Sequence, residues 1–233
     1  MSEKPPYKTQ DDKWIAIDDY IAENFFDDDP ALDATLAASE TAGLPEIQVA
    51  PLQGKLLMML AASLGARNVL EVGTLGGYST IWLARGLVDG GRVVTLELDP
   101  GHAAVARKNF ENAGLGDRIE VRVGAALDTL AALHAEHAGP FDLIFIDADK
   151  PSTPDYFDWA VKLARKGTLI VVDNVVREGA ILAAQSENKH VKGLRGFYAR
   201  VAADPRVTAT AIQTVGNKGH DGLAIVRVIA EPD

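Results

Sequence analysis

The amino-acid sequence predicts a doubly wound α/β fold, with a mostly parallel sheet of about seven strands and an antiparallel hairpin at one edge. Five short apolar runs alternate with helical stretches, a pattern typical of parallel strands that are buried on both faces. Two further apolar runs near the C-terminus are joined by a short Gly-rich turn, and strands so close in sequence must pair antiparallel. The length of 233 residues suits one such domain.

The first part of the chain is expected to be helical. Apolar residues three or four positions apart, from Trp14 to Phe25, indicate an amphipathic helix. Asp29 followed by Pro30 is typical of the cap and first residue of another helix. We expect a polar arm over residues 1–10 and helices over 11–26, 30–43 and 51–64. Residues 1–64 would then be a helical extension of a single domain, 1–233, whose α/β core is 65–233.

The strands of the core are read from the apolar runs. The five expected parallel strands are Asn68–Val72, Val93–Glu97, Ile119–Val123, Leu143–Asp147 and Leu169–Asp173. A last helix is expected near Leu194–Ala202, before the hairpin strands Thr208–Val215 and Leu223–Ile229. Asp221 and Gly222 are typical turn residues, so we place them in the hairpin turn.

Composition excludes several classes of function. Lys and Arg number 23 against 33 Asp and Glu, and the net charge of −10 argues against nucleic acid or an anionic membrane as the main partner. The chain has no cysteine, which excludes disulfides, thiolate metal sites and a Cys nucleophile. No apolar run is long enough for a membrane helix and no signal peptide is visible, so a cytoplasmic location is expected.

A glycine-rich loop follows the first strand, in the order Glu71-Val72-Gly73-Thr74-Leu75-Gly76-Gly77-Tyr78-Ser79. Glycines let the backbone approach a ligand, and the helix that follows offers unpaired amides. A dinucleotide fingerprint is excluded, because Leu75 and Tyr78 stand where its second and third glycines belong. Glu71 suits a ligand with a positive charge. Glu97, which ends the second strand, can accept hydrogen bonds from both hydroxyls of a ribose.

This ordered set of residues resembles class I S-adenosylmethionine-dependent methyltransferases, whose sheet is Rossmann-like. Residues 68–179 are similar to the cation-dependent catechol and caffeoyl-CoA O-methyltransferase family. The resemblance implies that the loop packs against S-adenosylmethionine, that Glu97 binds its ribose and that the stretch from Gly124 to Asp128 frames its adenine. The cofactor-binding residues it implies are Val49, Glu71, Gly73, Thr74, Leu75, Gly77, Tyr78, Ser79, Glu97, Leu98, Gly124, Ala125, Ala126, Asp147 and Asp149.

Carboxylates end two strands that should be neighbours. Asp147 follows the fourth strand, and Asp173 with Asn174 follows the fifth. Two adjacent carboxylates repel unless they are neutralised, and oxygen ligands suit Mg²⁺. The same residues also favour helix caps and turns, so the residues alone leave both interpretations open. The resemblance implies that Asp147, Asp173 and Asn174 bind Mg²⁺ or another divalent cation.

Lys150 is either a solvated loop lysine or a general base. The resemblance implies that Lys150 is catalytic together with Asp147, and a nearby cation would lower the pKa of the lysine toward neutrality. The upstream stretch around Val49 departs from the family, since Ala-Pro-Leu-Gln stands where an acidic residue is usual, and we expect no metal ligand there. Ala148 stands where the catechol enzyme has an aromatic residue, so that wall of the substrate site should differ.

The expected reaction is the transfer of a methyl group from S-adenosylmethionine to a hydroxyl of a small phenolic acceptor, a vicinal diol that chelates the metal. Two alternatives are a methyltransferase with a non-phenolic acceptor and a non-catalytic S-adenosylmethionine-binding protein. Arg177 is expected to line the substrate mouth. The polar segment 185–196 is either a mobile lid or a solvated loop. The resemblance also implies a homodimer.

Overall fold

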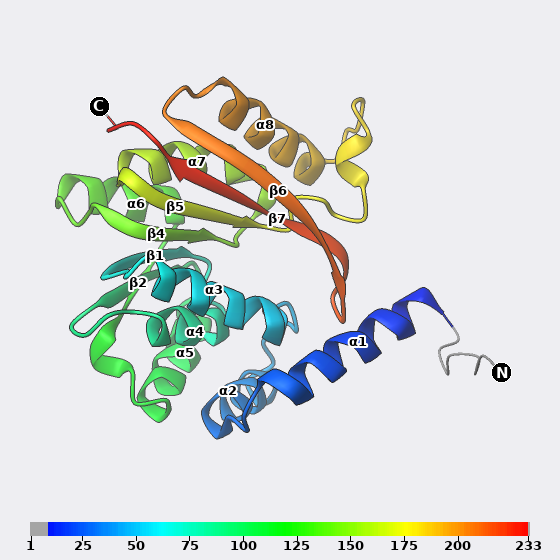
Figure 1. Cartoon of the computed structure of the whole chain (residues 1–233). Helices are drawn as coiled ribbons and strands as arrows, with labels where there is room; N and C mark the ends of the chain where they lie inside the picture. The colour runs from blue at the N-terminus through cyan, green and yellow to red at the C-terminus, as the bar shows by residue number, and fades with distance from the viewer. Residues whose placement is uncertain (1–8, 233) are drawn as a thin grey trace.

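The computed structural model describes residues 9–232, which build a single seven-stranded sheet in the order β3-β2-β1-β4-β5-β7-β6 (Figure 1). The strands are β1 (Asn68–Val72), β2 (Arg92–Glu97), β3 (Ile119–Val123), β4 (Phe141–Ile146), β5 (Ala164–Asp173), β6 (Val207–Gly216) and β7 (Gly219–Val228). Neighbouring strands among β1 to β5 pair parallel, whereas β7 is antiparallel to β5 and to β6. The predicted fold class is confirmed.

Helices cover both faces of this sheet (Figure 1). They are α1 (Gln10–Phe25), α2 (Pro30–Thr41), α3 (Pro51–Ser63), α4 (Tyr78–Arg85), α5 (Pro100–Asn112), α6 (Ala126–Ala135), α7 (Thr153–Lys162) and α8 (Lys189–Ala203). Three short 3-10 turns are η1 (Gly116–Arg118), η2 (Lys150–Ser152) and η3 (Ala180–Leu182). Figure 1 shows α3, α4 and α5 on one side of the sheet and α6, α7 and α8 on the other.

Each face of the sheet has its own apolar core. Val69 and Leu143 pack with α3, α4 and α5, while Leu70 and Ile144 pack with α6, α7 and α8. Successive residues of a strand point to opposite faces, so a strand that is buried on both sides must be apolar at nearly every position. This explains why the central strands read as continuous apolar runs.

The N-terminal helices begin at capped residues. Thr9 Oγ1 accepts a hydrogen bond from Asp12 N at 3.1 Å, and Asp29 Oδ1 accepts one from Leu32 N at 3.2 Å. Helix α1 extends away from the body and has no fully buried residue among those described (Figure 1). Residues 1–8 of the expected arm lie outside the described residues. In the part of the chain that the structure describes, no helix has the length and apolar character to span a membrane.

The prediction for the hairpin turn is wrong. The ladder between β6 and β7 continues to the pair Gly216–Gly219, so the turn is at residues 217–218. Asp221 and Gly222 therefore lie inside β7. The carboxylate of Asp221 binds backbone amides of another loop, a contact that no local turn pattern reveals.

The interpretation of residues 185–196 as a loop is also wrong for most of its length. Helix α8 begins at Lys189, because Asn188 Oδ1 accepts a hydrogen bond from His190 N at 2.9 Å. Val191 and Leu194 are buried in the apolar contacts of this helix. A helix with a capped start and buried side chains is not a solvated loop.

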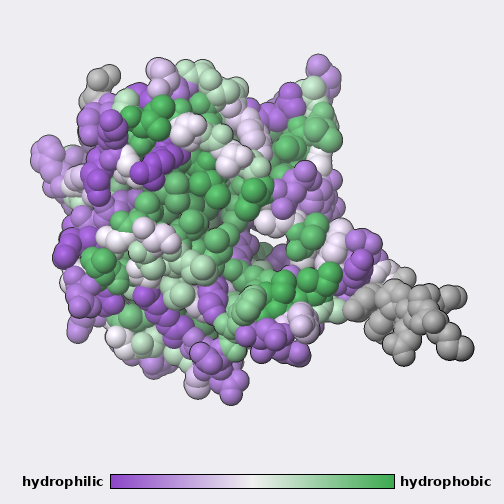
Figure 2. Space-filling view, in the orientation of Figure 1, coloured by the Kyte–Doolittle hydropathy of each residue, from purple (hydrophilic) through white to green (hydrophobic). Residues whose placement is uncertain are grey.

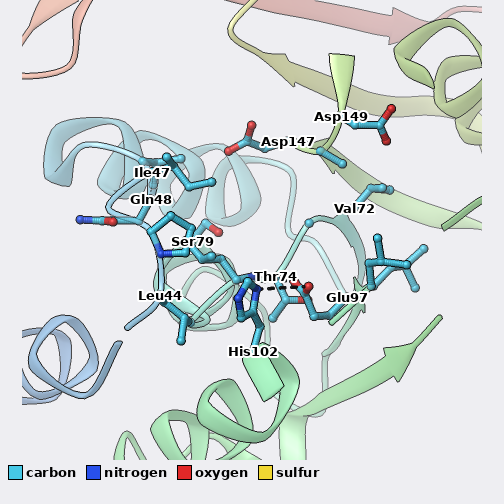
Figure 3. Close-up of a pocket in the computed structure, with 18 of the residues that line it drawn as sticks. Leu44, Ile47, Gln48, Val72, Thr74, Ser79, Glu97, His102, Asp147 and Asp149 are labelled. Carbon is cyan, nitrogen blue, oxygen red and sulfur yellow. Dashed lines mark hydrogen bonds and ion pairs between the residues drawn. The ribbon is translucent and has the colours of Figure 1, made fainter. Parts of the chain in front are cut away.

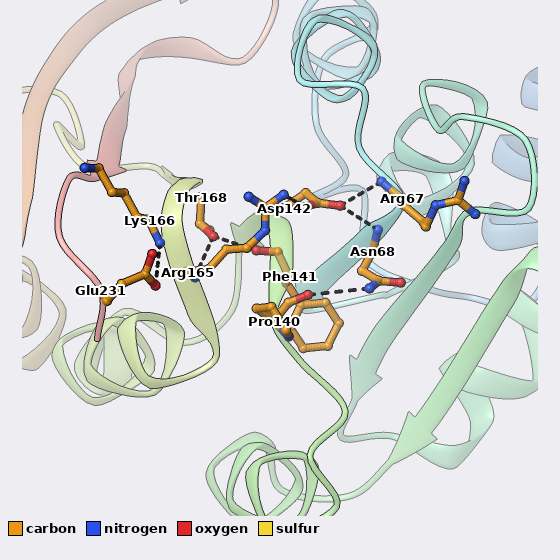
Figure 4. A network of polar contacts seen from close by, with 9 residues as sticks. All are labelled: Arg67, Asn68, Pro140, Phe141, Asp142, Arg165, Lys166, Thr168 and Glu231. Atoms are coloured by element: carbon orange, nitrogen blue, oxygen red, sulfur yellow. Dashed lines mark hydrogen bonds and ion pairs between the residues drawn. The ribbon is translucent and has the colours of Figure 1, made fainter. Parts of the chain in front are cut away.

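A polar network joins the amino ends of three strands, at the edge opposite to the candidate site (Figure 4). Asp142 Oδ2 accepts hydrogen bonds from the amides of Arg67 at 2.8 Å and Asn68 at 2.9 Å. Arg165 pairs with the same carboxylate, and Thr168 Oγ1 donates to the carbonyl of Phe141 at 2.6 Å. These contacts tie β1, β4 and β5 together and leave their carboxyl ends for the site.

Candidate active site

A cavity of about 900 Å³ lies at the carboxyl ends of the parallel strands (Figure 3). It is lined by the loops after β1 to β5, by the segment between α2 and α3, and by the start of α8. In a doubly wound sheet this edge is where ligands bind, because the connections of β1 and β4 diverge to opposite faces there.

Glu97 anchors the glycine-rich loop to β2. Its carboxylate accepts hydrogen bonds from Leu75 N at 2.8 Å and from Asp99 N at 2.9 Å. The ring of His102 points toward the same carboxylate, with Nδ1 3.6 Å from Oε1 (Figure 3). Glu97 is therefore held in one orientation at the end of β2, where it lines the cavity.

Two glycines of the loop are required by contacts within the protein. A Cβ at Gly73 would lie 2.1 Å from the carbonyl oxygen of Asp147, and a Cβ at Gly77 would lie 2.3 Å from the ring of Phe110. Both residues also have positive φ, 105° and 88°. A side chain at either position would move the loop away from β4 or α5, so these glycines set the shape of the cavity wall.

Glu71 differs from its expected position. Its side chain is fully buried and does not line the cavity. The carboxylate accepts hydrogen bonds from Ser79 Oγ and Thr95 Oγ1, both at 2.6 Å, and from Thr80. Burial raises the pKa of Glu71 to about 7 against the opposing effect of these hydroxyls. Glu71 thus holds the start of α4 against β1 and β2, and its carboxylate lies behind the surface of the cavity.

Asp147, Lys150, Asp173 and Asn174 come together at the ends of β4 and β5. Lys150 Nζ lies 2.8 Å from Asp147 Oδ1, although the lysine is only 6% exposed. Asp173 is buried beside them and accepts a hydrogen bond from Asn174 N at 2.6 Å. Burial and the negative charge of Asp147 raise the pKa of Asp173.

This cluster has the chemistry of a site for a hard divalent cation. Its donors are the carboxylate oxygens of Asp147 and Asp173 and the amide oxygen of Asn174, with no nitrogen or sulfur ligand among them. The buried carboxylate of Asp173 and the half-buried carboxylate of Asp147 face one lysine, so ionisation of both leaves an excess negative charge that a cation would neutralise. Among residues 9–232 no group of three or more His, Asp or Glu side chains could hold a metal ion by itself.

Asp149 also follows β4, but its side chain points away from that of Asp147 (Figure 3). Burial opposes its ionisation, but hydrogen bonds from Tyr156 and Ser152 hold the pKa of Asp149 below its ordinary value. Ser152 Oγ donates to Asp149 Oδ2 at 2.7 Å. Asp149 is therefore an ionised carboxylate that is held at the cavity wall by η2 and α7.

The structure brings most of the predicted residues to one cavity. Those that line it are Val49, Gly73, Thr74, Leu75, Tyr78, Ser79, Glu97, Leu98, Gly124, Ala125, Ala126, Asp147, Asp149, Lys150 and Asn174, whereas Glu71, Gly77 and Asp173 lie behind its surface. Sequence reasoning missed the lining residues Leu36, Ser39, Leu44, Ile47, His102 and Tyr156. His102 had a local signal, because it lies in the first turn of α5, the helix that begins shortly after Glu97. The residues between 36 and 47 had none, because only tertiary packing brings them to the sheet.

The family model for O-methyltransferases matches residues 24–229. The chain belongs to the O-methyltransferase family. The chain is 54% identical over 212 residues to a catechol O-methyltransferase of Mycobacterium tuberculosis, with 91% of this chain and 94% of the relative covered. It is 51% identical over 214 residues to a catechol O-methyltransferase of Niastella koreensis, with coverages of 91% and 96%.

Solved structures of O-methyltransferases have the same fold. An O-methyltransferase from Bacillus cereus in complex with SAH is 54% identical, with a TM-score of 0.92 and coverage of 93% of this chain and 98% of that one. The resemblance inferred from the glycine-rich loop and Glu97 is therefore confirmed at the level of the family and the fold.

Proposed function

We propose that this O-methyltransferase transfers a methyl group from S-adenosylmethionine to a hydroxyl of a small phenolic acceptor, a vicinal diol. One observation carries the proposal: a single cavity holds Glu97, a carboxylate suited to a ribose, and the oxygen-rich cluster of Asp147, Lys150 and Asn174. The names of the relatives support it, since two of them are catechol O-methyltransferases and one solved neighbour holds SAH, the demethylated cofactor.

The cofactor would lie along the wall formed by the glycine-rich loop. In this proposal Glu97 accepts hydrogen bonds from the ribose hydroxyls, while Leu98 and the segment Gly124–Ala126 contact the nucleoside. Val49, Thr74, Ser79 and the carboxylate of Asp147 face the methionine end. Glu71 and Gly77 contribute by holding the loop in place, behind the surface of the cavity.

Asp147, Asp173 and Asn174 would hold Mg²⁺ or another divalent cation at the acceptor end of the cavity. When bound, the cation supplies positive charge that favours an ionised hydroxyl and fixes the orientation of a diol. Lys150 Nζ, in its neutral form, takes the proton of the reacting hydroxyl. The hydroxyl oxygen then forms a bond to the methyl carbon while the bond from that carbon to sulfur breaks, and the sulfonium becomes a neutral thioether.

The surroundings of the reacting atoms favour this step. Opposite charges of the attacking oxygen and the sulfonium are annihilated in the transition state, so a site with little water and fixed reactants accelerates the reaction. Lys150 and Asp173 are nearly inaccessible to solvent, and η2 holds the lysine against the end of β4.

The test is the transfer of labelled methyl from S-adenosylmethionine to a panel of catechols, with Mg²⁺ and with EDTA. We expect transfer that EDTA abolishes and Mg²⁺ restores. Transfer that persists in EDTA would contradict the cation and keep the methyltransferase. Absence of transfer to any diol would favour a non-phenolic acceptor or, if S-adenosylmethionine binds in calorimetry, a non-catalytic binding protein.

We also propose that the chain forms a homodimer. Apolar side chains of α1 and β6 are exposed, among them Ile17, Tyr20 and Phe25 on α1 and Ile212 and Val215 on β6. Figure 2 shows green, hydrophobic surface along α1 and over the body beside it. Exposed apolar patches of this kind are typical of interfaces. Light scattering should give twice the monomer mass of 24.9 kDa, and Tyr20→Glu should lower it.

A further inference from the structure

The loop after β5, residues 174–179, has an unusual backbone. Asn174, Arg177 and Glu178 have φ values of 56°, 48° and 53°, and Gly179 has φ of 79°. Residues with a Cβ rarely adopt this left-handed conformation, and it persists only where surrounding contacts enforce it. The loop begins at the carboxylate–amide cluster and carries Arg177 to the cavity, which this residue lines.

Strand β7 enforces this conformation through one side chain. Asp221 Oδ1 accepts hydrogen bonds from Val176 N at 3.0 Å and from Arg177 N at 2.9 Å, and it also accepts one from Gly222 N at 2.9 Å. The carbonyl of His220 accepts a further bond from Glu178 N at 3.0 Å. The backbone at Arg177 is therefore held by the start of the neighbouring strand β7, through a residue 44 positions away in the sequence.

Close packing supports the same contact. A Cβ at Gly222 would lie 2.6 Å from Val176 Cγ2, so β7 approaches the loop closely because this position has no side chain. Val175 and Val176 are buried against the core and leave Arg177 at the surface of the cavity. The loop thus presents one cationic side chain from a backbone that is fixed on both sides.

The charge of Arg177 has no protein partner in the described part of the chain. None of the ion pairs found among residues 9–232 includes this guanidinium, whereas Lys150 is paired with Asp147. Arg177 and His190 line the cavity on the β5 side, and the carboxylate of Glu97 lies at the β2 side. The acceptor end therefore has a positive charge available for a ligand.

We propose that Arg177, positioned by the Asp221 clamp on its backbone, determines specificity by binding a carboxylate carried by the phenolic acceptor. The proposal rests on the proposed function, since it names the acceptor class of the same site. A guanidinium binds a carboxylate with two parallel hydrogen bonds, and a fixed backbone reduces the entropy lost in forming them. The preferred acceptor is then a catechol carboxylic acid.

The test compares 3,4-dihydroxybenzoate with its neutral analogue 3,4-dihydroxybenzamide. The ratio of their kcat/KM values is measured in the wild type, in Arg177→Gln and in the control Arg200→Gln, whose arginine pairs with Asp155 and Asp158 on the outer surface. The two compounds differ in the acidity of their hydroxyls. This difference affects the ratio equally in every protein, so it cancels when the ratios are compared. We expect Arg177→Gln to lower the ratio at least tenfold, mainly through KM for the benzoate, and Arg200→Gln to leave it unchanged.

Variants of Asp221 distinguish its role in positioning Arg177 from a general effect on folding. Asp221→Ala should lower the same ratio, whereas Asp221→Asn should restore most of it, because the amide oxygen can accept the same backbone hydrogen bonds. Calorimetric binding of S-adenosylmethionine should be the same in all variants. A ratio that stays within twofold in Arg177→Gln would overturn the assignment, and a ratio that is insensitive to Asp221→Ala would overturn the clamp.

Binding experiments distinguish this proposal from the proposed function. If the wild type methylates neither compound, the proposed methyl transfer to a phenolic diol fails. Calorimetric affinities for the benzoate and the benzamide then provide the comparison without turnover. Equal affinities in the wild type, or an unchanged preference in Arg177→Gln, would refute the role of Arg177 independently.

Discussion

Gly193 in α8 lies directly against the backbone of Lys150. A Cβ at position 193 would be 2.2 Å from the carbonyl oxygen of Lys150 and 2.7 Å from Pro151 Cα. Helix α8 therefore supports the turn η2 from behind, at the residue whose ammonium faces Asp147. The position of the proposed general base depends on a helix almost forty residues further along the chain, and the contact requires a glycine.

Gly193→Ala should displace this turn. The clash is with backbone atoms that cannot rotate away, so we expect a stability loss of about 1–3 kcal/mol and a methyl-transfer rate lowered more than tenfold. Gly196→Ala is the control, because its Cβ would meet only Pro154 Cγ at 3.2 Å and alanine favours helices. Urea unfolding and initial rates measure the two effects. Equal behaviour of the two variants would show that α8 does not position Lys150.

Substitutions of Lys150 should distinguish its role in proton transfer from the effect of its positive charge beside Asp147. Lys150→Met removes both, and Lys150→Arg keeps a cation beside Asp147 that cannot lose its proton. If Lys150 is the base, both variants should lose about 10²–10⁴-fold in kcat and bind S-adenosylmethionine like the wild type. Rapid-quench rates and calorimetry are the measurements. Near-normal turnover of Lys150→Arg would assign the lysine an electrostatic role only.

Glu97→Gln should weaken cofactor binding. The carboxylate now accepts from Leu75 N and Asp99 N, and the amide group of glutamine would turn an N–H toward one of them. Loss of a charge-assisted hydrogen bond of about 1.5–3 kcal/mol lowers the affinity for S-adenosylmethionine roughly 10- to 150-fold. Glu111→Gln, at an exposed position of α5, is the matched control. An unchanged affinity in calorimetry would exclude Glu97 from the cofactor site.

Glu71 should make the stability of the cofactor-free and metal-free protein depend on pH. Its pKa is about 7 in the folded protein against 4.5 ordinarily, so the folded state keeps a proton that the unfolded chain releases. Stability contributed by this group is therefore lost as the pH rises from about 4.5 to 7. Glu71→Gln has no such titration. Its stability relative to the wild type should increase between pH 5 and pH 8, by roughly 3 kcal/mol at most.

Urea unfolding at the two pH values checks this expectation, with Glu111→Gln as the control. A difference between Glu71→Gln and the wild type that is the same at pH 5 and pH 8 would mean that the folded protein does not favour protonated Glu71. A difference that decreases with pH would mean that the three hydroxyl donors outweigh burial.

The fold was largely predictable because its signals are local. The apolar runs ending at Val72 and Glu97 mark strands that are buried on both faces, and their boundaries agree with β1 and β2 within one residue. Asp29 caps α2 as its pairing with Pro30 indicates. Each of these features depends on neighbouring residues, whose spacing is visible in the sequence.

The candidate site was predictable only in part. The sequence placed Glu97, Asp147 and Asn174 at strand ends, and in a parallel sheet such ends meet at one edge. It could not show that the carboxylate of Glu71 turns inward, because the hydroxyls that bind it come from α4 and β2. It also assigned Asp221 to a turn, since nothing local indicates a hydrogen bond to Arg177 N.

The sequence by itself determined the α/β class, the order of strands and helices along the chain, and the residue types available for binding a cofactor and a cation. Only the tertiary structure decided which side chains face the cavity, where Arg177 is held and how α8 supports Lys150. The physical reason is the distance along the chain over which each kind of interaction acts. Periodicity and capping act over a few residues, whereas the direction of a side chain at a strand end depends on partners from distant segments.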